Sequence, residues 1–148
     1  MQFFNFFTRR GNSNGVFTNL EKKINYKFIN HEYLKQAFTH RSISPKPREN
    51  YERLEFLGDA IIDIVVSQAL MMEFKEGDEG LLTQKRSSLV KKEFLGTMGK
   101  LLQLLSYITI EQTVNLNIEK IAVKQQANLY EALVGAIYLD GGLQPCKY

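Results

Sequence analysis

Four acidic side chains recur at helical spacing in the stretch NYERLEFLGDAIID, residues 50–63. At about 100° per residue they fall within roughly 80° of one another on a helix; they are Glu52, Glu55, Asp59 and Asp63. Like charges at this spacing repel one another, and the repulsion grows when the site loses water. The one basic residue of the stretch, Arg53, points off this stripe. A divalent metal such as Mg²⁺ or Mn²⁺ is the simplest source of the missing positive charge, because both accept oxygen ligands.

A second pair of oxygen-bearing side chains lies far along the chain, where Asn128 and Glu131 stand at positions i and i+3. On a helix these two share a face. If that helix packs against the first one, they can meet Glu55 and Asp59, so that three carboxylates and one amide oxygen surround a common point. Such a set suits Mg²⁺ with retained waters, and it can lower the pKa of a bound water for attack on a phosphodiester.

A plain structural explanation of the acidic stripe stands beside the metal hypothesis. Amphipathic helices are common, and a row of acids is usually a solvated face. The same two explanations, a solvated face or phosphate contacts, apply to four basic side chains along a later helix: Lys85, Arg86, Lys91 and Lys92. His40 is expected to brace its loop by hydrogen bonds rather than to act in catalysis.

Helical spacing of apolar residues predicts that helices carry these side chains. The expected helices cover residues 20–28, 31–38, 50–74, 79–105 and 125–139, with a single turn at 118–123. Asn50 and Asp78 are expected to cap two of them, and Gly141-Gly142 to end the last. Gly96 and Gly99 fall inside the helix at 79–105, where they weaken or bend it. No stretch predicts a strand with confidence, so the expected fold class is all-α.

Composition fits one globular domain without a membrane span. The 148 residues are 44% hydrophobic and 24% charged, and no apolar run reaches about 18 residues. Residues 1–50 carry nine Lys or Arg against three acids, whereas residues 51–76 carry two against six. Basic flanks around an acidic centre suit a polyanion that meets metal ions. The lone Cys146 excludes an internal disulfide and fits a reducing, cytoplasmic compartment.

The first 18 residues are expected to form a flexible N-terminal arm. This segment carries four Phe residues before Thr8, then Arg9 and Arg10, then a run rich in Gly, Asn and Ser. Its apolar part is too short and too early for a secretory signal. We expect the arm to dock its Phe residues on a neighbour.

Four blocks of the sequence, in the same order, resemble the ribonuclease III family. They are THRS at 39–42, ERLEFLGD at 52–59, the middle motif with DEG at 78–80, Arg86 and LV at 89–90, and YEAL with GAIYLD at 130–140. The blocks cover roughly residues 20–143, which implies an all-α nuclease domain over residues 19–148. Family members continue through another helix and usually into a double-stranded-RNA-binding domain, and the resemblance implies that neither is present in full here.

The resemblance implies a role for each matching acid. The metal-binding positions are matched by Glu55, Asp59, Asn128 and Glu131. Asp59 and Glu131 match the pair that is essential for catalysis, and Glu52 matches a supporting glutamate. Many members have Asp where this chain has Asn128, whose amide oxygen can coordinate but brings no charge. Metal binding is therefore expected to be weaker.

Three further positions carry implied roles. Phe56 matches an aromatic side chain that enters a pocket of the partner subunit, which implies a homodimer. Lys85 and Arg86 lie where the family places positive groups near its substrate. Asp63, one turn beyond the catalytic acids, could compensate for the neutral amide, although a solvated position is favoured.

The implied function is hydrolysis of double-stranded RNA in the processing of rRNA and mRNA, with Mg²⁺ or Mn²⁺. Two facing sites in a dimer would leave 5′-phosphates, 3′-hydroxyls and short 3′ overhangs. Little base specificity is expected, because A-form RNA is recognised mainly by shape and 2′-hydroxyls. The alternative is a non-cleaving RNA-binding or ribosome-associated relative with the same fold. A purely structural helical dimerisation module leaves the acidic stripe unexplained.

Overall fold

The computed structural model describes residues 13–147, and these form a fold built from helices. In chain order they are α1 Ser13–Val16, α2 Thr18–Ile24, α3 Glu32–Ala37, α4 Glu52–Glu73, α5 Glu79–Val90, α6 Lys92–Leu101, the 3-10 helix η1 Leu104–Tyr107, α7 Glu119–Gly141 and the 3-10 helix η2 Gln144–Lys147. Over the described residues, β pairing is limited to an isolated bridge between Thr39 and Thr109. The all-α prediction is therefore confirmed.

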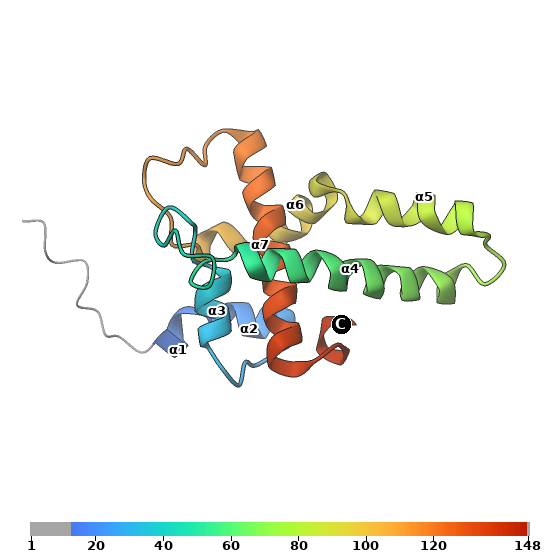
Figure 1. Ribbon diagram of the computed structural model, residues 1–148, viewed down its shortest axis with the longest axis horizontal. Coiled ribbons are helices and arrows are strands. Elements are labelled where there is room, and N and C mark those ends of the chain that lie inside the picture. Colours follow the sequence, from blue (N-terminus) through green and yellow to red (C-terminus); the bar gives the residue numbers. More distant parts are fainter. Residues whose placement is uncertain (1–12, 148) are drawn as a thin grey trace, which may run out of the picture.

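Helix α7 is the central element (Figure 1). Helix α4 crosses it, α6 and α3 pack against it, and the second half of α4 extends from the body together with α5 as a two-helix arm. The main core gathers fully buried side chains from four elements: Leu20, Leu34, Leu104, Leu129 and Leu133. A smaller cluster of Ile62, Leu95 and Ala127 joins α4, α6 and α7. No helix among the described residues has the length and apolar character that crossing a membrane requires.

The start of the described chain corrects the predicted arm. Residues 1–12 lie outside the described residues, but residues 13–18 are not a loose segment, because α1 and the first residue of α2 are helical. Phe17 between them is buried, and its ring centroid lies 5.5 Å from that of Phe38 and 6.0 Å from that of Tyr107. Burial of this aromatic surface holds the segment on the core.

Asn50 ties the loop before α4 to the first turn of that helix. Its Oδ1 accepts a hydrogen bond from the Glu52 backbone N–H at 3.0 Å, while its Nδ2 donates to the Ser44 carbonyl at 3.0 Å. The side chain is fully buried, so both of its polar ends need these partners. The predicted capping function is present, one residue further from the helix than expected, because α4 begins after Tyr51.

The expected helix at 79–105 is wrong as a single element. It divides into α5 and α6 at Lys91, whose backbone is extended with φ −68° and ψ 149°. The chain must turn there because α5 lies along α4 with no buried residue, whereas α6 packs against α7. Gly96 and Gly99 do not bend a helix; their missing side chains let α6 approach the α7 backbone. The predicted N-cap Asp78 is confirmed, since its Oδ1 accepts from the Leu81 N–H at 2.9 Å.

Helix α7 is longer than predicted. The separate turn expected at 118–123 is its first part, so one helix runs from Glu119 to Gly141. The close approach of α6 to Val123 and Gln126 supports this early part. The predicted end is confirmed, because Gly142 takes φ +81°, a conformation that glycine adopts at little cost.

Candidate functional site

The site is built where α4 and α7 cross with their backbones in contact. A Cβ atom at Gly58 would overlap the Glu131 carbonyl group, and one at Gly135 would overlap the Leu54 carbonyl oxygen. Glycine at both positions therefore permits the close crossing. Glu55 lies one turn from Gly58 on α4, and Glu131 lies one turn from Gly135 on α7, so the crossing brings their side chains together.

Three oxygen-bearing side chains at this crossing surround one ammonium group. Lys92 Nζ donates to Glu131 Oε2 at 2.6 Å, to Asn128 Oδ1 at 3.0 Å and to Glu55 Oε1 at 3.4 Å. The Glu131 side chain is 3% exposed and that of Glu55 25%, whereas Lys92 is 47% exposed. We call Glu55, Asn128 and Glu131 the oxygen cluster. The structure thus brings together three of the four residues predicted to hold a metal.

Burial controls the charge of the oxygen cluster. Loss of solvent raises the pKa of Glu131, and the hydrogen bond and charge of Lys92 lower it only in part. Loss of solvent also raises the pKa of Glu55, and Lys92 again lowers it only in part. For Lys92, burial favours the neutral amine, but the hydrogen bond and charge of Glu131 outweigh it and raise the pKa of the ammonium. The cluster therefore binds a cation tightly, and each of its carboxylates carries a desolvation cost.

The other acids of the α4 stripe lie outside this arrangement. Asp59 is exposed and makes no ion pair in the described chain, although its charge helps to raise the pKa of Glu131. Glu52 pairs with Arg41 instead, with Oε1 3.7 Å from Arg41 Nη1, and its charge helps to raise the pKa of Glu55. Asp63 has no ion pair with any described residue. The acidic stripe is thus divided, and only Glu55 of its four members contacts the cation.

The oxygen cluster fits a divalent metal by its chemistry. Two carboxylates and an amide oxygen converge on a point that already holds a positive charge, and oxygen is the donor that Mg²⁺ and Mn²⁺ prefer. No group of three His, Cys, Asp or Glu in residues 13–147 is arranged to hold a metal ion. The convergent set includes the amide of Asn128 beside two carboxylates, and its role as a metal ligand stays a prediction.

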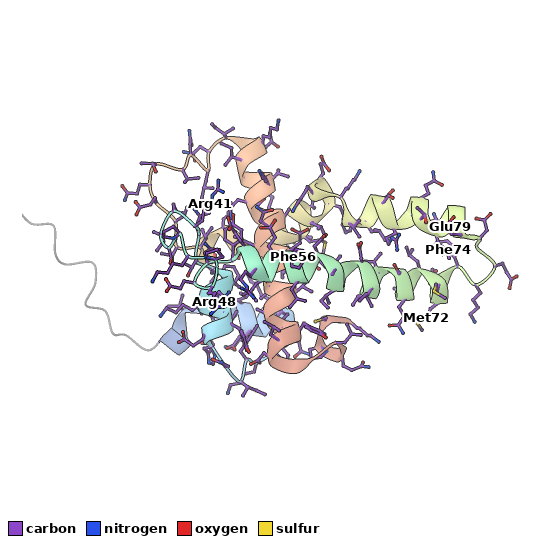
Figure 2. The ribbon with its side chains drawn as sticks, viewed as in Figure 1. Arg41, Arg48, Phe56, Met72, Phe74 and Glu79 are labelled. Atoms are coloured by element: carbon purple, nitrogen blue, oxygen red, sulfur yellow. The ribbon has the colours of Figure 1, made fainter. Side chains whose placement is uncertain are left out.

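The basic residues proposed for substrate contact lie on the two-helix arm. Arg86 Nη1 donates to Ser67 Oγ at 3.0 Å and so links α5 to α4. Lys85 Nζ lies 4.8 Å from the centre of the Phe74 ring, near the far end of the arm, where Figure 2 labels Phe74 and Met72. Both positive groups are engaged within the arm, and a contact with phosphate stays a prediction.

His40 braces the loop before α4, as expected. Its Nδ1 contacts Ser42 twice, at 2.7 Å from Oγ and 3.0 Å from the backbone N, which donates to it. Its own backbone N–H donates to the Thr109 carbonyl at 3.0 Å. The ring is buried, and burial lowers its pKa, so the neutral form is favoured.

Phe56 is a strongly exposed aromatic side chain of α4. It is 83% exposed on α4, near the crossing with α7 (Figure 2). A cavity of about 800 Å³ opens beside it, and Arg48, Leu57 and Leu139 are among its lining residues. An exposed aromatic side chain next to a cavity forms a surface that a second copy of the same chain can match.

Lys92 is the site residue whose role the sequence did not reveal. It was one of four basic residues assigned to the outside of a helix. Lys92 lies two residues after Val90, the last residue of α5, and looks like any solvated residue until α6 is known to start there. The one available signal was charge balance, because the acids needed a positive partner from outside α4.

Comparison with known proteins agrees with this architecture. Residues 30–148 match the family described as Ribonuclease-III-like. Ribonuclease 3 of Zunongwangia profunda is 40% identical over 144 residues, which are 95% of this chain and 58% of that protein. Ribonuclease 3 of Flavobacterium psychrophilum is 40% identical over 147 residues, again 58% of its length. The chain thus spans a little more than half the length of these curated relatives.

Solved structures extend the comparison to the fold. The nuclease domain of ribonuclease III from Campylobacter jejuni superposes with a TM-score of 0.81 at 34% identity, covering 88% of this chain and 90% of that one. Dicer from Pichia stipitis, at 24% identity and a TM-score of 0.58, shares the fold. With a family match that covers most of its length, the chain belongs to the ribonuclease-III-like family.

Proposed function

We propose that this protein is an endoribonuclease that hydrolyses phosphodiester bonds of double-stranded RNA with the help of a divalent metal. The observation that carries the proposal is the convergence of the oxygen cluster on one cation at the α4–α7 crossing. Family membership supports it, since the matched relatives are named Ribonuclease 3. The expected products carry 5′-phosphate and 3′-hydroxyl ends with short 3′ overhangs.

Each residue of the site has a proposed task. Glu55, Asn128 and Glu131 would hold the metal, and Asp59 would join them from the exposed edge of α4. A bound divalent metal supplies Lewis acidity and a water of lowered pKa. Glu131 is fixed in orientation by its burial, and the exposed Asp59 would accept a proton or a hydrogen bond from water. Glu52 supports the helix start through its backbone hydrogen bond to Asn50.

Mg²⁺ is the metal that we propose, with Mn²⁺ as a substitute. Asn128 replaces a charged ligand with a neutral one, so the oxygen cluster has two negative charges instead of three. Weaker attraction for Mg²⁺ follows, and the softer Mn²⁺ binds such a site more readily by the general order of affinities. A role in rRNA and mRNA processing and a cytoplasmic location stay predictions.

We propose that the protein acts as a homodimer through the surface around Phe56. A two-fold interface needs an anchor and a pocket on the same patch of each subunit, and Phe56 lies beside the cavity of about 800 Å³. Other exposed apolar side chains follow along α4: Ile64, Met71 and Met72. In the Campylobacter jejuni nuclease domain, structural flexibility is found in a region involved in dimer formation.

Phe56→Ala is expected to shift the protein from dimer to monomer. The change removes an aromatic anchor from each of the two subunits, and each loss costs about 2 kcal/mol or more at the centre of an interface, which weakens dimerisation roughly a thousandfold. Light scattering across a micromolar dilution series measures the shift. Ile29→Ala is the matched control, because Ile29 is 85% exposed but lies in the loop after α2. A wild type that is monomeric at every concentration contradicts the dimer.

A cleavage assay tests the proposed activity. The full chain is incubated with a long RNA duplex and with Mg²⁺, Mn²⁺ or EDTA, and the product ends are mapped. We expect cleavage that requires the divalent metal and leaves 5′-phosphates with short 3′ overhangs. Binding of duplex RNA without cleavage at any metal concentration would instead select the non-cleaving relative, for which the neutral Asn128 is the favouring feature.

A further inference from the structure

The position that the proposed function gives to a metal holds a side chain of the protein itself. The Lys92 ammonium donates to all three members of the oxygen cluster, at 2.6 Å, 3.0 Å and 3.4 Å. These are the distances of direct hydrogen bonds and a close ion pair, so the ammonium occupies the point on which the three oxygen atoms converge.

The backbone delivers Lys92 to this point. Lys92 is the first residue of α6, directly after the extended Lys91 that ends α5. Helix α6 is held on α7 by close backbone approach, since a Cβ at Gly96 would contact Val123 and one at Gly99 would contact Gln126. The start of α6 is therefore fixed relative to Asn128 and Glu131, and the ammonium reaches the cluster because of the fold.

Charge explains why a cation is needed there at all. Glu131 is 3% exposed, and a buried carboxylate without a positive partner is strongly unfavourable. Asn128 is neutral, so Glu55 and Glu131 carry two negative charges, of which one ammonium cancels half. A divalent ion alone would cancel both, so Lys92 would no longer be needed as the counter-charge. Lys92 and a divalent metal are therefore competitors for the same oxygen atoms.

The exposure of Lys92 allows its ammonium group to leave the oxygen cluster when a metal ion takes its place. Its side chain is 47% exposed, whereas the carboxylate that it pairs with is almost fully buried. A lysine stem can rotate and return its ammonium to water without unfolding its helix. The oxygen cluster itself lies on the two crossing helices, which do not have to move.

We propose that Lys92 is a resident counter-cation that holds the oxygen cluster together in the metal-free protein, and that a divalent metal binds by displacing its ammonium. The inference rests on the proposed function, because it concerns the same metal site. Lys92 is a positioning residue in this scheme. It sets the metal concentration at which the site loads, and it keeps the buried acids paired until then.

Mn²⁺ binding to the full chain without RNA tests the inference. Free Mn²⁺ is measured by electron paramagnetic resonance for wild type, Lys92→Met, Lys92→Arg and Lys91→Met. Lys92→Met is expected to bind Mn²⁺ about tenfold more tightly, because a competing unit charge is removed from the site. Lys92→Arg keeps the cation and is expected to stay close to wild type. Lys91→Met is the matched control, since it removes the same charge from an exposed neighbour that has no ion pair among the described residues.

Thermal stability provides a second readout. In EDTA, Lys92→Met is expected to have a lower Tm than wild type, because Glu131 loses its cation. Added Mn²⁺ is expected to raise the Tm of this variant more than that of wild type. Should Lys92→Met fail to fold, Lys92→Gln keeps a hydrogen-bond donor without the charge and is expected to show both effects with the same sign.

The outcomes separate the inference from the function on which it rests. If Lys92→Met binds Mn²⁺ no more tightly than wild type, or if Lys92→Arg gains as much affinity as Lys92→Met, the displacement scheme is wrong. Metal-dependent cleavage by the wild type would still stand in that case. If neither wild type nor Lys92→Met binds Mn²⁺, the metal site itself is wrong, and the inference fails with it.

Discussion

Glu131→Gln is expected to reduce cleavage of duplex RNA about a thousandfold or more, a loss of about 4 kcal/mol of transition-state stabilisation. The substitution keeps the size of the side chain but removes one of the two negative charges of the oxygen cluster. Glu55 and Glu131 both contact the cation, so the carboxylate of Glu55 is already in use and cannot replace that of Glu131. Single-turnover rates at saturating Mg²⁺ measure the effect.

The same variant is expected to remain folded, with a Tm within about 5 °C of wild type. Burial raises the pKa of Glu131, so the neutral amide avoids a desolvation cost that the carboxylate incurs. Lys92 keeps Glu55 as its ion partner and is half exposed, so it is not left as a buried, unpaired charge. An inactive variant that unfolds would therefore not satisfy the prediction.

Two further substitutions on α4 sharpen this result. The single variant Asp59→Asn is expected to lose cleavage to the same extent as Glu131→Gln. Asp63→Asn, the same change one turn further along α4, is expected to keep the wild-type rate of cleavage. Cleavage by Glu131→Gln at the wild-type rate would mean that the catalytic site lies away from the α4–α7 crossing.

Gly58→Ala is expected to destabilise the protein by about 3 kcal/mol or more, which lowers the Tm by about 10 °C. The added methyl group would overlap the Glu131 carbonyl group, which belongs to the backbone of a central helix and cannot rotate away. The two helices must separate, so cleavage is expected to fall as well. Differential scanning calorimetry measures the stability change.

Gly80→Ala is the matched control for this substitution. Gly80 lies in α5, and the nearest heavy atom to an added Cβ is 3.6 Å away, an ordinary contact. Since alanine favours helix over glycine by up to about 1 kcal/mol, the control is expected to leave the Tm unchanged or raise it. Equal Tm values for the two alanine variants would show that α4 and α7 do not touch at Gly58.

The sequence predicted the parts of the fold that depend on local rules. Apolar spacing indicated α4, and the side chain of Asp78 caps α5 as expected, because an N-cap needs only its own first turn. The break at Lys91 could not be predicted, because apolar spacing continues through it. It follows from packing on two different neighbours, which a local pattern does not contain.

The candidate site was predictable to a similar extent. The one-turn spacing of Asn128 and Glu131 placed both on one face of α7, and the acids of α4 indicated a cation. Helical spacing alone did not select among the acids, because Glu52 and Asp63 satisfy it as well as Glu55. The family resemblance singled out Glu55 and Asp59, and of these only Glu55 contacts the ammonium. The close contact of α4 and α7 at Gly58 and Gly135 places Glu55 beside Glu131, and Lys92 comes from a helix whose start was not predicted.

The glycine crossing also has a consequence for the order of events during synthesis. Gly58 and Gly135 are 77 positions apart in the sequence, so their contact closes a long loop and is of the kind that forms late in folding. A growing chain that has exposed α4 but not α7 has neither Asn128 nor Glu131 within reach. The proposed nuclease site therefore comes into existence only when α7 has left the ribosome, and a partly made chain near ribosomal RNA carries no assembled site.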